Sequence, residues 1–571
     1  MLNLSSFAFS CTFTRILLAL LLVALRLPAA AQAPTWQSAR AVGVATAAAA
    51  GTYTEVTATA IDAAGNVFLT GYFRNTMVLG GTTLTSLGGY DLFVAKFNPA
   101  NSQFLWVQRA GGTGTDYAFA LVVSGTSVYV AGTFEGPTAS FGPATLTNAG
   151  SADGFVAKLT DAGSTGSFTW AQQAGGTDYD TAAALAVSGT SVYVAGNFNS
   201  STIGFGPATL TNAGGNDAFV AKLTDAGSTG SFVWAQRAGG TGSDAANKLA
   251  VSGTSVYVVG DFNSSAGFGP ITLTSVGSAD GFVAKLTDAG STGSFVWAQR
   301  AGGTGYDSTF VLAISGTSVY VAGFFNSSTA DFGPATLTNA GTVGTADVFV
   351  AKITDAGSTG SFVWAQRAGG TGYDAPYALA VSGNSVYVAG TFASSTVGFG
   401  SATLTSAGSY DVFVAKLTDA GSTGSFVWSQ RAGGSGREEA YALAVSGASV
   451  YVAGTLDSPT ADFGTTTLTN PNPGTRLGFL AALTDPTLTA TAANRALAPA
   501  QLFPNPARRT ATLRLPAGVG PAPLTLTDAL GRAVRYYPAP AGPEAVLDLR
   551  DLPAGLYLLR GAGPAQRLAV E

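Results

Sequence analysis

Short runs in which apolar and polar residues alternate recur along most of the chain. In the unit around residue 250, residues 255–262, 281–286 and 294–301 alternate in this way, and residues 248–252 form a short apolar run before them. Tight turns such as Asp288 to Gly293 separate the runs. A period of two between glycine-containing turns is typical of antiparallel strands. Each unit is therefore predicted to contribute four strands.

The unit recurs with a spacing of 63 to 70 residues, marked by the seven tryptophans of the chain. The tryptophan-bearing fourth strand comes first, at residues 35–40; six complete units follow, and the last unit stops after its third strand, at residues 478–483. A linear array gives no reason for this split. A ring requires it, because the N-terminal strand then completes the last sheet and leaves no exposed edge. We therefore predict an all-β fold, a seven-bladed β-propeller over residues 34–486 that is closed by its N-terminal strand.

Two segments of the first unit, Ala60 to Gly71 and Tyr90 to Lys96, resemble bacterial SBBP-type β-propeller repeats. The resemblance extends over roughly residues 35–486. It implies the propeller fold and a secreted or cell-surface protein, and it implies no particular ligand.

The N-terminus has the features of a secretory signal peptide, which we place at residues 1–31. Arg15 supplies a positive charge, residues 16–25 form an apolar run too short to span a bilayer comfortably, and residues 29–31 are three alanines suited to cleavage. The sequence thus predicts an exported protein.

Composition restricts the chemistry of the exported chain. Histidine is absent, and the single cysteine, Cys11, lies in the predicted signal peptide. These absences exclude Ser-His-Asp and Cys-His catalysis and the common zinc sites. Only 10% of the residues are charged, and they form no basic stripe. We therefore predict a protein that is not an enzyme and that does not bind nucleic acid.

The repeats stop near residue 486. Residues 487–500 are rich in alanine, threonine and proline and are predicted to form a linker. Residues 501–571 contain six short strand-like runs, which predict a small C-terminal β-sandwich domain.

Three segments of this last domain, residues 503–506, 528–532 and 552–560, occur in the order found in type A C-terminal sorting domains of the bacterial type IX secretion system, and the domain is similar to that family. The resemblance implies that the type IX machinery and its sortase are partners. It also implies a location outside the cell or on the outer-membrane surface of a Gram-negative bacterium. The residues that match the sorting signal are Pro504, Asn505, Pro506, Gly531, Arg532, Gly555 and Tyr557.

One acid in each unit stands 13 residues before the aromatic residue of the second strand. The turn before it joins two units, and in a propeller that turn lies near the mouth of the central channel. The carboxylates are therefore candidates for a ligand or cation site, with calcium as the cation that such oxygen ligands would recruit. Alternatively, each carboxylate accepts backbone N–H groups and only fixes its turn. The candidates are Glu55, Asp116, Asp180, Asp244, Asp307, Asp374 and Glu438.

A second acid opens the third strand in six units, five residues before a lysine, as at Asp280 and Lys285. An odd spacing places the two side chains on opposite faces of a strand, so we do not expect them to pair.

The connections between second and third strands, such as residues 134–152 and 324–346, are the longest and least uniform segments. Their Asn, Ser, Thr, Phe and Tyr residues would suit a glycan on the channel-mouth face, or the connections only cover sheet edges. Our leading hypothesis is a surface protein that binds an extracellular glycan or protein and catalyses nothing. The alternatives are a polysaccharide-active enzyme that uses carboxylates alone and a passive surface or matrix component.

Overall fold

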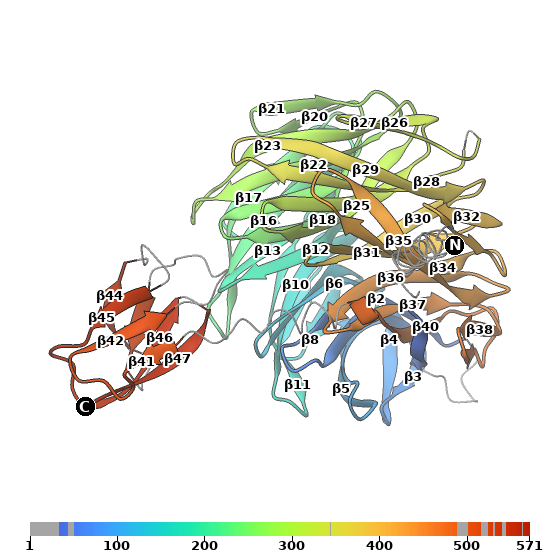
Figure 1. Cartoon of the computed structure of the whole chain (residues 1–571). Helices are drawn as coiled ribbons and strands as arrows, with labels where there is room; N and C mark the ends of the chain where they lie inside the picture. Colours follow the sequence, from blue (N-terminus) through green and yellow to red (C-terminus); the bar gives the residue numbers. More distant parts are fainter. Residues whose placement is uncertain are drawn as a thin grey trace, which may run out of the picture. The chain divides into compact units, whose positions relative to one another are not determined.

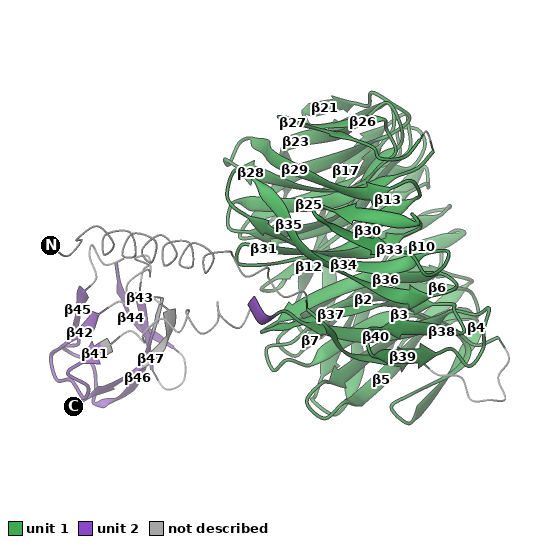
Figure 2. Cartoon of the chain, turned by 45° about the vertical axis from the view of Figure 1, so that its right-hand side comes forward, with its two compact units in different colours: residues 1–485 green, residues 486–571 purple. Residues whose placement is uncertain are grey.

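The computed structural model describes residues 34–43, 51–342, 344–487, 501–514, 524–528, 532–538, 544–561 and 563–571. The chain divides into two compact units, one ending at Asp485 and the other beginning at Pro486 (Figure 2). The predicted signal peptide, nearly all of the predicted linker and Gly531 lie outside the described residues. Among the residues that are described, no helix is long and apolar enough to cross a membrane.

The first unit is built from β-strands, and the prediction of an all-β fold is confirmed. In its described part the four strands of each repeat lie side by side in chain order, each paired antiparallel with the next. In the sheet of the last repeat the order is β36, β37, β40 and β1, so the N-terminal strand supplies the fourth position, with Ala41 opposite Phe479. This placement of β1 is the one that the order of the repeats predicts.

The strands have the following bounds. The first strands are β2 (Tyr53–Ile61), β6 (Asp116–Ser124), β12 (Asp180–Ser188), β18 (Asp244–Ser252), β24 (Asp307–Ser315), β30 (Asp374–Ser382) and β36 (Glu438–Ser446). The second strands are β3 (Val67–Leu79), β7 (Ser127–Glu135), β13 (Ser191–Phe198), β19 (Ser255–Phe262), β25 (Ser318–Phe325), β31 (Ser385–Phe392) and β37 (Ser449–Leu456). The third strands are β4 (Thr82–Asn98), β10 (Ala152–Asp161), β16 (Asp217–Asp225), β22 (Asp280–Asp288), β28 (Asp347–Asp355), β34 (Asp411–Asp419) and β40 (Leu477–Thr484). The fourth strands are β5 (Gln103–Gly112), β11 (Gly166–Ala174), β17 (Gly230–Gly240), β23 (Gly293–Gly303), β29 (Gly360–Gly370), β35 (Gly424–Gly434) and β1 (Trp36–Val42).

The first strands contact one another in chain order from β2 to β36, and β36 contacts β2. The sheets therefore radiate from a common axis that the first strands surround (Figure 1). Four-stranded antiparallel sheets arranged in this way define a β-propeller.

Each first strand carries a β-bulge near its middle. In β18 the pairing skips Asn247, because Ala246 pairs with Gly260 and Lys248 pairs with Val259. The two backbones approach closely here, and a Cβ atom at Gly260 would lie 1.8 Å from the Ala245 carbonyl oxygen, so the recurring glycine of the second strand is required. The skipped residues are Thr57, Phe119, Ala183, Asn247, Phe310, Tyr377 and Tyr441.

The long connections between second and third strands contain short hairpins. In most repeats the first hairpin strand pairs with the fourth strand of the preceding sheet, as β20 does with β17. Phe268 packs 4.8 Å from Phe282 and 5.6 Å from Phe295 between ring centroids. Covering an outer strand removes an exposed sheet edge. The structure therefore favours the edge-covering interpretation of these connections over free ligand-binding loops. The hairpins are β8 (Thr138–Phe141) and β9 (Ala144–Thr147), β14 (Thr202–Phe205) and β15 (Ala208–Thr211), β20 (Ser265–Phe268) and β21 (Ile271–Thr274), β26 (Thr329–Phe332) and β27 (Ala335–Thr338), β32 (Thr396–Phe399) and β33 (Ala402–Thr405), and β38 (Thr460–Phe463) and β39 (Thr466–Thr469).

A buried polar contact joins neighbouring sheets. Asp288, the last residue of β22, accepts hydrogen bonds from Lys222 Nζ (2.6 Å), the Tyr193 hydroxyl (2.7 Å) and Trp234 Nε1 (3.0 Å) of the preceding sheet. The lysine therefore pairs with an acid of the next sheet. The prediction that it does not pair with the acid of its own strand is confirmed. The same lysine–aspartate contact recurs at Lys96–Asp161, Lys158–Asp225, Lys285–Asp355, Lys352–Asp419 and Lys416–Asp485.

The contact between the last and the first sheets differs from the others. Ala482 stands at the lysine position of β40, and Pro99, the third residue after Lys96, stands at the position of the turn aspartate in the first repeat. Arg476 joins these two sheets instead, with Nη1 2.8 Å from Glu55 Oε2 and Nη2 3.4 Å from Glu439 Oε2.

The second unit consists of two small sheets, and apolar residues from both sheets share one core. One sheet contains β41 (Gln501–Phe503), β42 (Thr510–Arg514) and β45 (Glu544–Asp548). The other contains β43 (Leu524–Thr527), β44 (Ala533–Tyr537), β46 (Gly555–Gly561) and β47 (Gly563–Val570).

The residues of the predicted sorting signal hold parts of this unit together. Asn505 Nδ2 donates to the Arg567 carbonyl (2.7 Å), and its Oδ1 accepts from the Ala569 amide (2.9 Å). The buried Tyr557 donates its hydroxyl to the Pro553 carbonyl (2.7 Å). Pro504, Pro506 and Gly555 are exposed, and Arg532 Nε lies 2.8 Å from Asp528 Oδ2.

Candidate functional site

Six of the seven candidate carboxylates are the first residues of their strands, and all six are buried. Asp307 is representative. Its Oδ2 accepts from the Gly303 amide (2.6 Å) and the Ser327 hydroxyl (2.6 Å), and its Oδ1 accepts from the Asn326 amide (3.0 Å). The carboxylate thus ties the turn before its strand to the start of the hairpin connection. These contacts are those of the turn-fixing interpretation.

A second buried carboxylate lies close to each of these acids. A Cβ atom at Gly111 would lie 2.6 Å from Asp116 Oδ2 and 3.0 Å from the carboxyl carbon of Asp91, so both carboxyl groups flank this glycine. Gly111 also has a positive φ of 137°, which favours glycine. Within the described residues, no three Asp, Glu, His or Cys side chains are grouped so as to hold a metal ion.

Burial raises the pKa of several of these acids. Burial is the main cause of the rise in the pKa of Asp116 to about 7, and the charge of Asp91 adds to it while the Gly112 amide opposes it. Burial likewise raises the pKa of Asp153 and of Asp244 to about 6. The folded protein therefore binds protons at these sites between about pH 4 and pH 7, where an unfolded aspartate has already released its proton.

The free energy of unfolding is expected to fall as the pH rises from 5 to 7.5, because the folded state must give up these protons while the unfolded state has none to lose. Asp116→Asn should reduce that fall by about 2 kcal/mol, since the amide cannot ionise. Chemical denaturation of both proteins at the two pH values measures the difference. Equal pH dependence of the two proteins would contradict the assignment.

Asp225→Asn serves as the opposite control. Burial would raise the pKa of Asp225, but hydrogen bonds from Lys158, Tyr129 and Trp170 outweigh that effect and lower it. The stability that Asp225 contributes is present above about pH 4 and is lost at lower pH. The free energy of unfolding of this variant should therefore change between pH 5 and 7.5 by the same amount as that of the unaltered chain.

Glu55, the seventh candidate, is not equivalent to the other six in the structure. Val56 pairs with Gly71 as Ala118 pairs with Gly132, which aligns Thr54, and not Glu55, with Asp116. The turn between the first two strands is one residue longer in the first repeat, so a count of residues from the aromatic position points one residue too far. Thr54 is buried and donates its hydroxyl to the Val42 carbonyl (3.0 Å).

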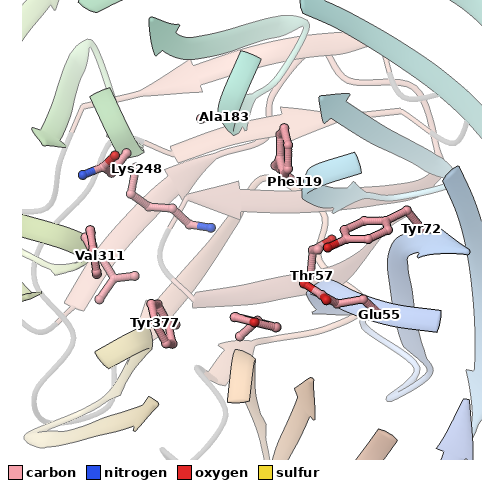
Figure 3. A pocket seen from close by; sticks show the side chains of 11 residues that line it. Glu55, Thr57, Tyr72, Phe119, Ala183, Lys248, Val311 and Tyr377 are labelled. Atoms are coloured by element: carbon pink, nitrogen blue, oxygen red, sulfur yellow. The ribbon is translucent and has the colours of Figure 1, made fainter. Parts of the chain in front are cut away.

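Glu55 faces the central channel and Asp116 does not. A cavity of about 310 Å³ lies in the channel, and Glu55 lines it together with residues from all the first strands. The other six candidate carboxylates do not line it. Figure 3 shows the side chains of Glu55, Tyr72, Phe119, Tyr377 and Lys248 directed toward this space.

The wall of the cavity is formed by the seven residues that the bulges skip. In six repeats they stand three residues after the buried acid, and five residue types occupy the seven positions: Thr57, Phe119, Ala183, Asn247, Phe310, Tyr377 and Tyr441. The buried acid and the glycine of the second strand recur in the repeats, whereas the residue type at the bulge varies. A ligand site is expected to have this property, because a single ligand in a ring of similar repeats must make different contacts with each of them.

Five aromatic residues line the cavity. On one side Tyr72 packs 4.6 Å from Tyr117, and Tyr117 stacks at 5.9 Å on Phe119. On the other side Phe310, Tyr377 and Tyr441 form a row, with centroid distances of 5.7 Å and 5.4 Å. The wall between them carries Ala183 and the polar side chains of Asn247 and Lys248, and Glu55 and Thr57 are the other polar residues of the lining.

The sequence analysis missed these residues. The signal was present, because aligning the repeats on the buried acid puts the seven variable residues in one column. The alternation of the first strand hid it, since a bulge reverses the face on which a side chain lies.

Comparisons with known proteins give no information about the ligand. No family model matches the sequence, and no curated protein matches it. Among solved structures the chain is similar to a protein from Lactobacillus plantarum, 13% identical, over 72% of this chain and 98% of that one, with a TM-score of 0.39. It is also similar to the Trypanosoma rangeli sialidase solved with sialic acid (10% identical, 82% and 85%, TM-score 0.33) and to Drosophila Semaphorin 2a (8% identical, 94% and 98%, TM-score 0.29). At these identities and TM-scores none of them indicates what this chain binds.

Proposed function

We propose that this chain is an SBBP-type, seven-bladed β-propeller, closed by its N-terminal strand, that binds a glycan in its central channel and catalyses nothing. The observation that carries the proposal is the channel wall. A repeated scaffold holds a cavity of about 310 Å³, and the residue types that line it vary among the repeats. This volume lies at the lower end of the usual range for small-ligand sites.

A sugar ring has apolar faces and polar edges, and the cavity offers both kinds of partner. Phe119 and Tyr377 present aromatic surfaces, and Thr57 and Asn247 present polar groups. Closure of the ring is supported by the pairing of β1 with β40 and by the contact between β36 and β2. If no saccharide binds, the two remaining functions are binding of a protein ligand and a passive surface role.

Non-catalytic binding is supported by the state of the carboxylates. Glu55 Oε2 accepts from the Tyr53 hydroxyl (2.7 Å) and from Arg476 (2.8 Å), and Glu439 Oε2 accepts from the Tyr441 hydroxyl (2.6 Å). Hydrolysis of a glycosidic bond requires one carboxyl group that keeps a proton and one that faces the sugar ring. These two carboxylates are instead held by the contact between the last and the first sheets.

We further propose that the second unit directs export through the type IX machinery and its sortase, to the outside of the cell or the outer-membrane surface of a Gram-negative bacterium. The resemblance of its three segments to sorting domains supports this route. Pro504, Asn505 and Pro506 are exposed, so a receptor can reach them.

A glycan array probed with the whole chain, with and without calcium, tests the binding proposal. Ala183→Trp places a large side chain in the cavity and is expected to weaken saccharide binding at least tenfold, because the ligand and the indole cannot share the space. Thr211→Trp, at an exposed hairpin position, is the matched control and should bind like the unaltered chain. Equal binding by both variants would exclude the channel as the site, and no saccharide binding in either condition would overturn the glycan proposal.

A further inference from the structure

Lys248 differs from every other lysine in the chain. The chain contains seven lysines, and six of them form the buried pairs between sheets. Lys248 follows the bulge of β18 and lines the channel. In the other first strands the same position in the pairing holds Ala58, Ala120, Ala184, Val311, Ala378 and Ala442.

The ammonium group of Lys248 has no hydrogen-bond or ion-pair partner among the described residues. Its side chain extends into the cavity (Figure 3) and also lines a second cavity of about 170 Å³ that continues the channel. Burial lowers the pKa of Lys248. An enclosed cation without a counter-ion is unfavourable, and alanine satisfies the same position in most other repeats. The fold therefore gives no reason for a lysine here.

The carboxylates around the cavity have other partners. Asp261 accepts from Asn247 Nδ2 (3.1 Å) and from the Ser308 hydroxyl (2.8 Å). Glu55 is held by Tyr53 and Arg476, as described above. Neither carboxylate is therefore the counter-ion of the Lys248 ammonium.

We infer that the saccharide bound in the channel is anionic, and that the Lys248 ammonium binds its carboxylate or sulfate group while the aromatic wall holds the ring. This inference rests on the proposed function and names the class of ligand for the same site. A lysine recognises an anion as a point charge and does not require the planar geometry that an arginine favours. Carboxylated and sulfated sugars share this chemistry, and separate experiments distinguish them.

Calorimetric titration of the whole chain with trigalacturonate, a sulfated galactose trisaccharide and neutral galactotriose tests the inference. Lys248→Met is expected to weaken binding of the preferred anionic sugar by about 10- to 100-fold, since a charge-assisted contact is lost. Binding of the neutral sugar should change less than twofold. Lys248→Arg keeps the charge and should retain most of the affinity for the anionic sugar.

Val311→Met is the matched control, because it places the same side chain at the equivalent position of the next repeat. It narrows the cavity without changing its charge, so it should affect anionic and neutral sugars alike. Lys248→Met should also be at least as stable to heat as the unaltered chain, because it removes an unpaired enclosed amine. A large loss of stability would mean that Lys248 has a structural partner, and would overturn the inference.

Acetylation of Lys248 in the unaltered chain, followed by mass spectrometry, gives a readout that does not depend on a variant. The anionic sugar should protect Lys248 at least fivefold, and the neutral sugar should not. Neutral and anionic sugars that bind equally well to the unaltered chain and to Lys248→Met would overturn the inference and leave the glycan proposal standing. If the chain binds none of the three sugars and Lys248 is acetylated equally in their presence and absence, the glycan proposal and the inference of an anionic sugar are both overturned for these ligands.

Discussion

Asp288→Ala is expected to destabilise the propeller by about 3–5 kcal/mol, the cost of removing one partner of a buried ion pair. The substitution leaves the Lys222 ammonium enclosed without its counter-ion and also removes the acceptor of the Tyr193 hydroxyl and of Trp234 Nε1. It further frees the Gly290 amide, which donates to Asp288 Oδ1 in the turn (2.9 Å). Chemical denaturation of the whole chain, followed by tryptophan fluorescence, measures the change.

Asn98→Ala is the matched control for that experiment. Asn98 lies in the corresponding turn of the first repeat, where its Oδ1 accepts from the Ala100 amide (2.9 Å) as Asp288 Oδ1 does from the Gly290 amide, and the lysine position of the last sheet holds Ala482. No buried charge is stranded by this substitution, so the expected loss is below about 1 kcal/mol. If Asp288→Ala cost no more than Asn98→Ala, the lysine–aspartate contacts would not be what holds neighbouring sheets together.

The repeated part of the fold could be predicted from the sequence because it depends on local patterns. Alternation, glycine turns and the displaced first strand led to the all-β fold, the four-stranded sheets and the pairing of β1 with β40. Spacing alone also separated Asp280 from Lys285. It did not reveal that Lys285 pairs with Asp355, because that partner stands 70 residues away in the next sheet and only the packing of sheets brings the two together.

The candidate site was predicted less well, for two physical reasons. An extra residue in a turn displaced the count for Glu55, and a bulge in each first strand turned the variable side chains toward the channel. Neither event changes the hydrophobic pattern. The sequence therefore drew attention to the acids that repeat, which fix turns, and away from the residues that vary, which line the cavity.

Arg476→Met is expected to cost about 2–3 kcal/mol, somewhat less than the loss of a fully buried pair because the Arg476 side chain is 26% exposed. The substitution leaves Glu55, on the first strand of the first sheet, without its cation, while Glu439 of the last sheet keeps Arg437, whose Nη2 lies 2.8 Å from Glu439 Oε1. Since this contact joins the first and last sheets, where Ala482 replaces the lysine of the repeated contact, hydrogen exchange should increase first in β1 and β2.

A double-mutant cycle with Glu55→Gln separates the ion pair from the packing of the arginine stem. Glu55→Gln in the Arg476→Met background should recover about 1–2 kcal/mol, because the glutamine no longer places an unpaired charge beside Glu439. Additive effects of the two substitutions would mean that the arginine stabilises the chain only through its aliphatic contacts. Coupling between them would mean that the charge contact of Arg476 stabilises the junction between the first and last sheets, where Ala482 stands at the position of the lysine of the repeated contact.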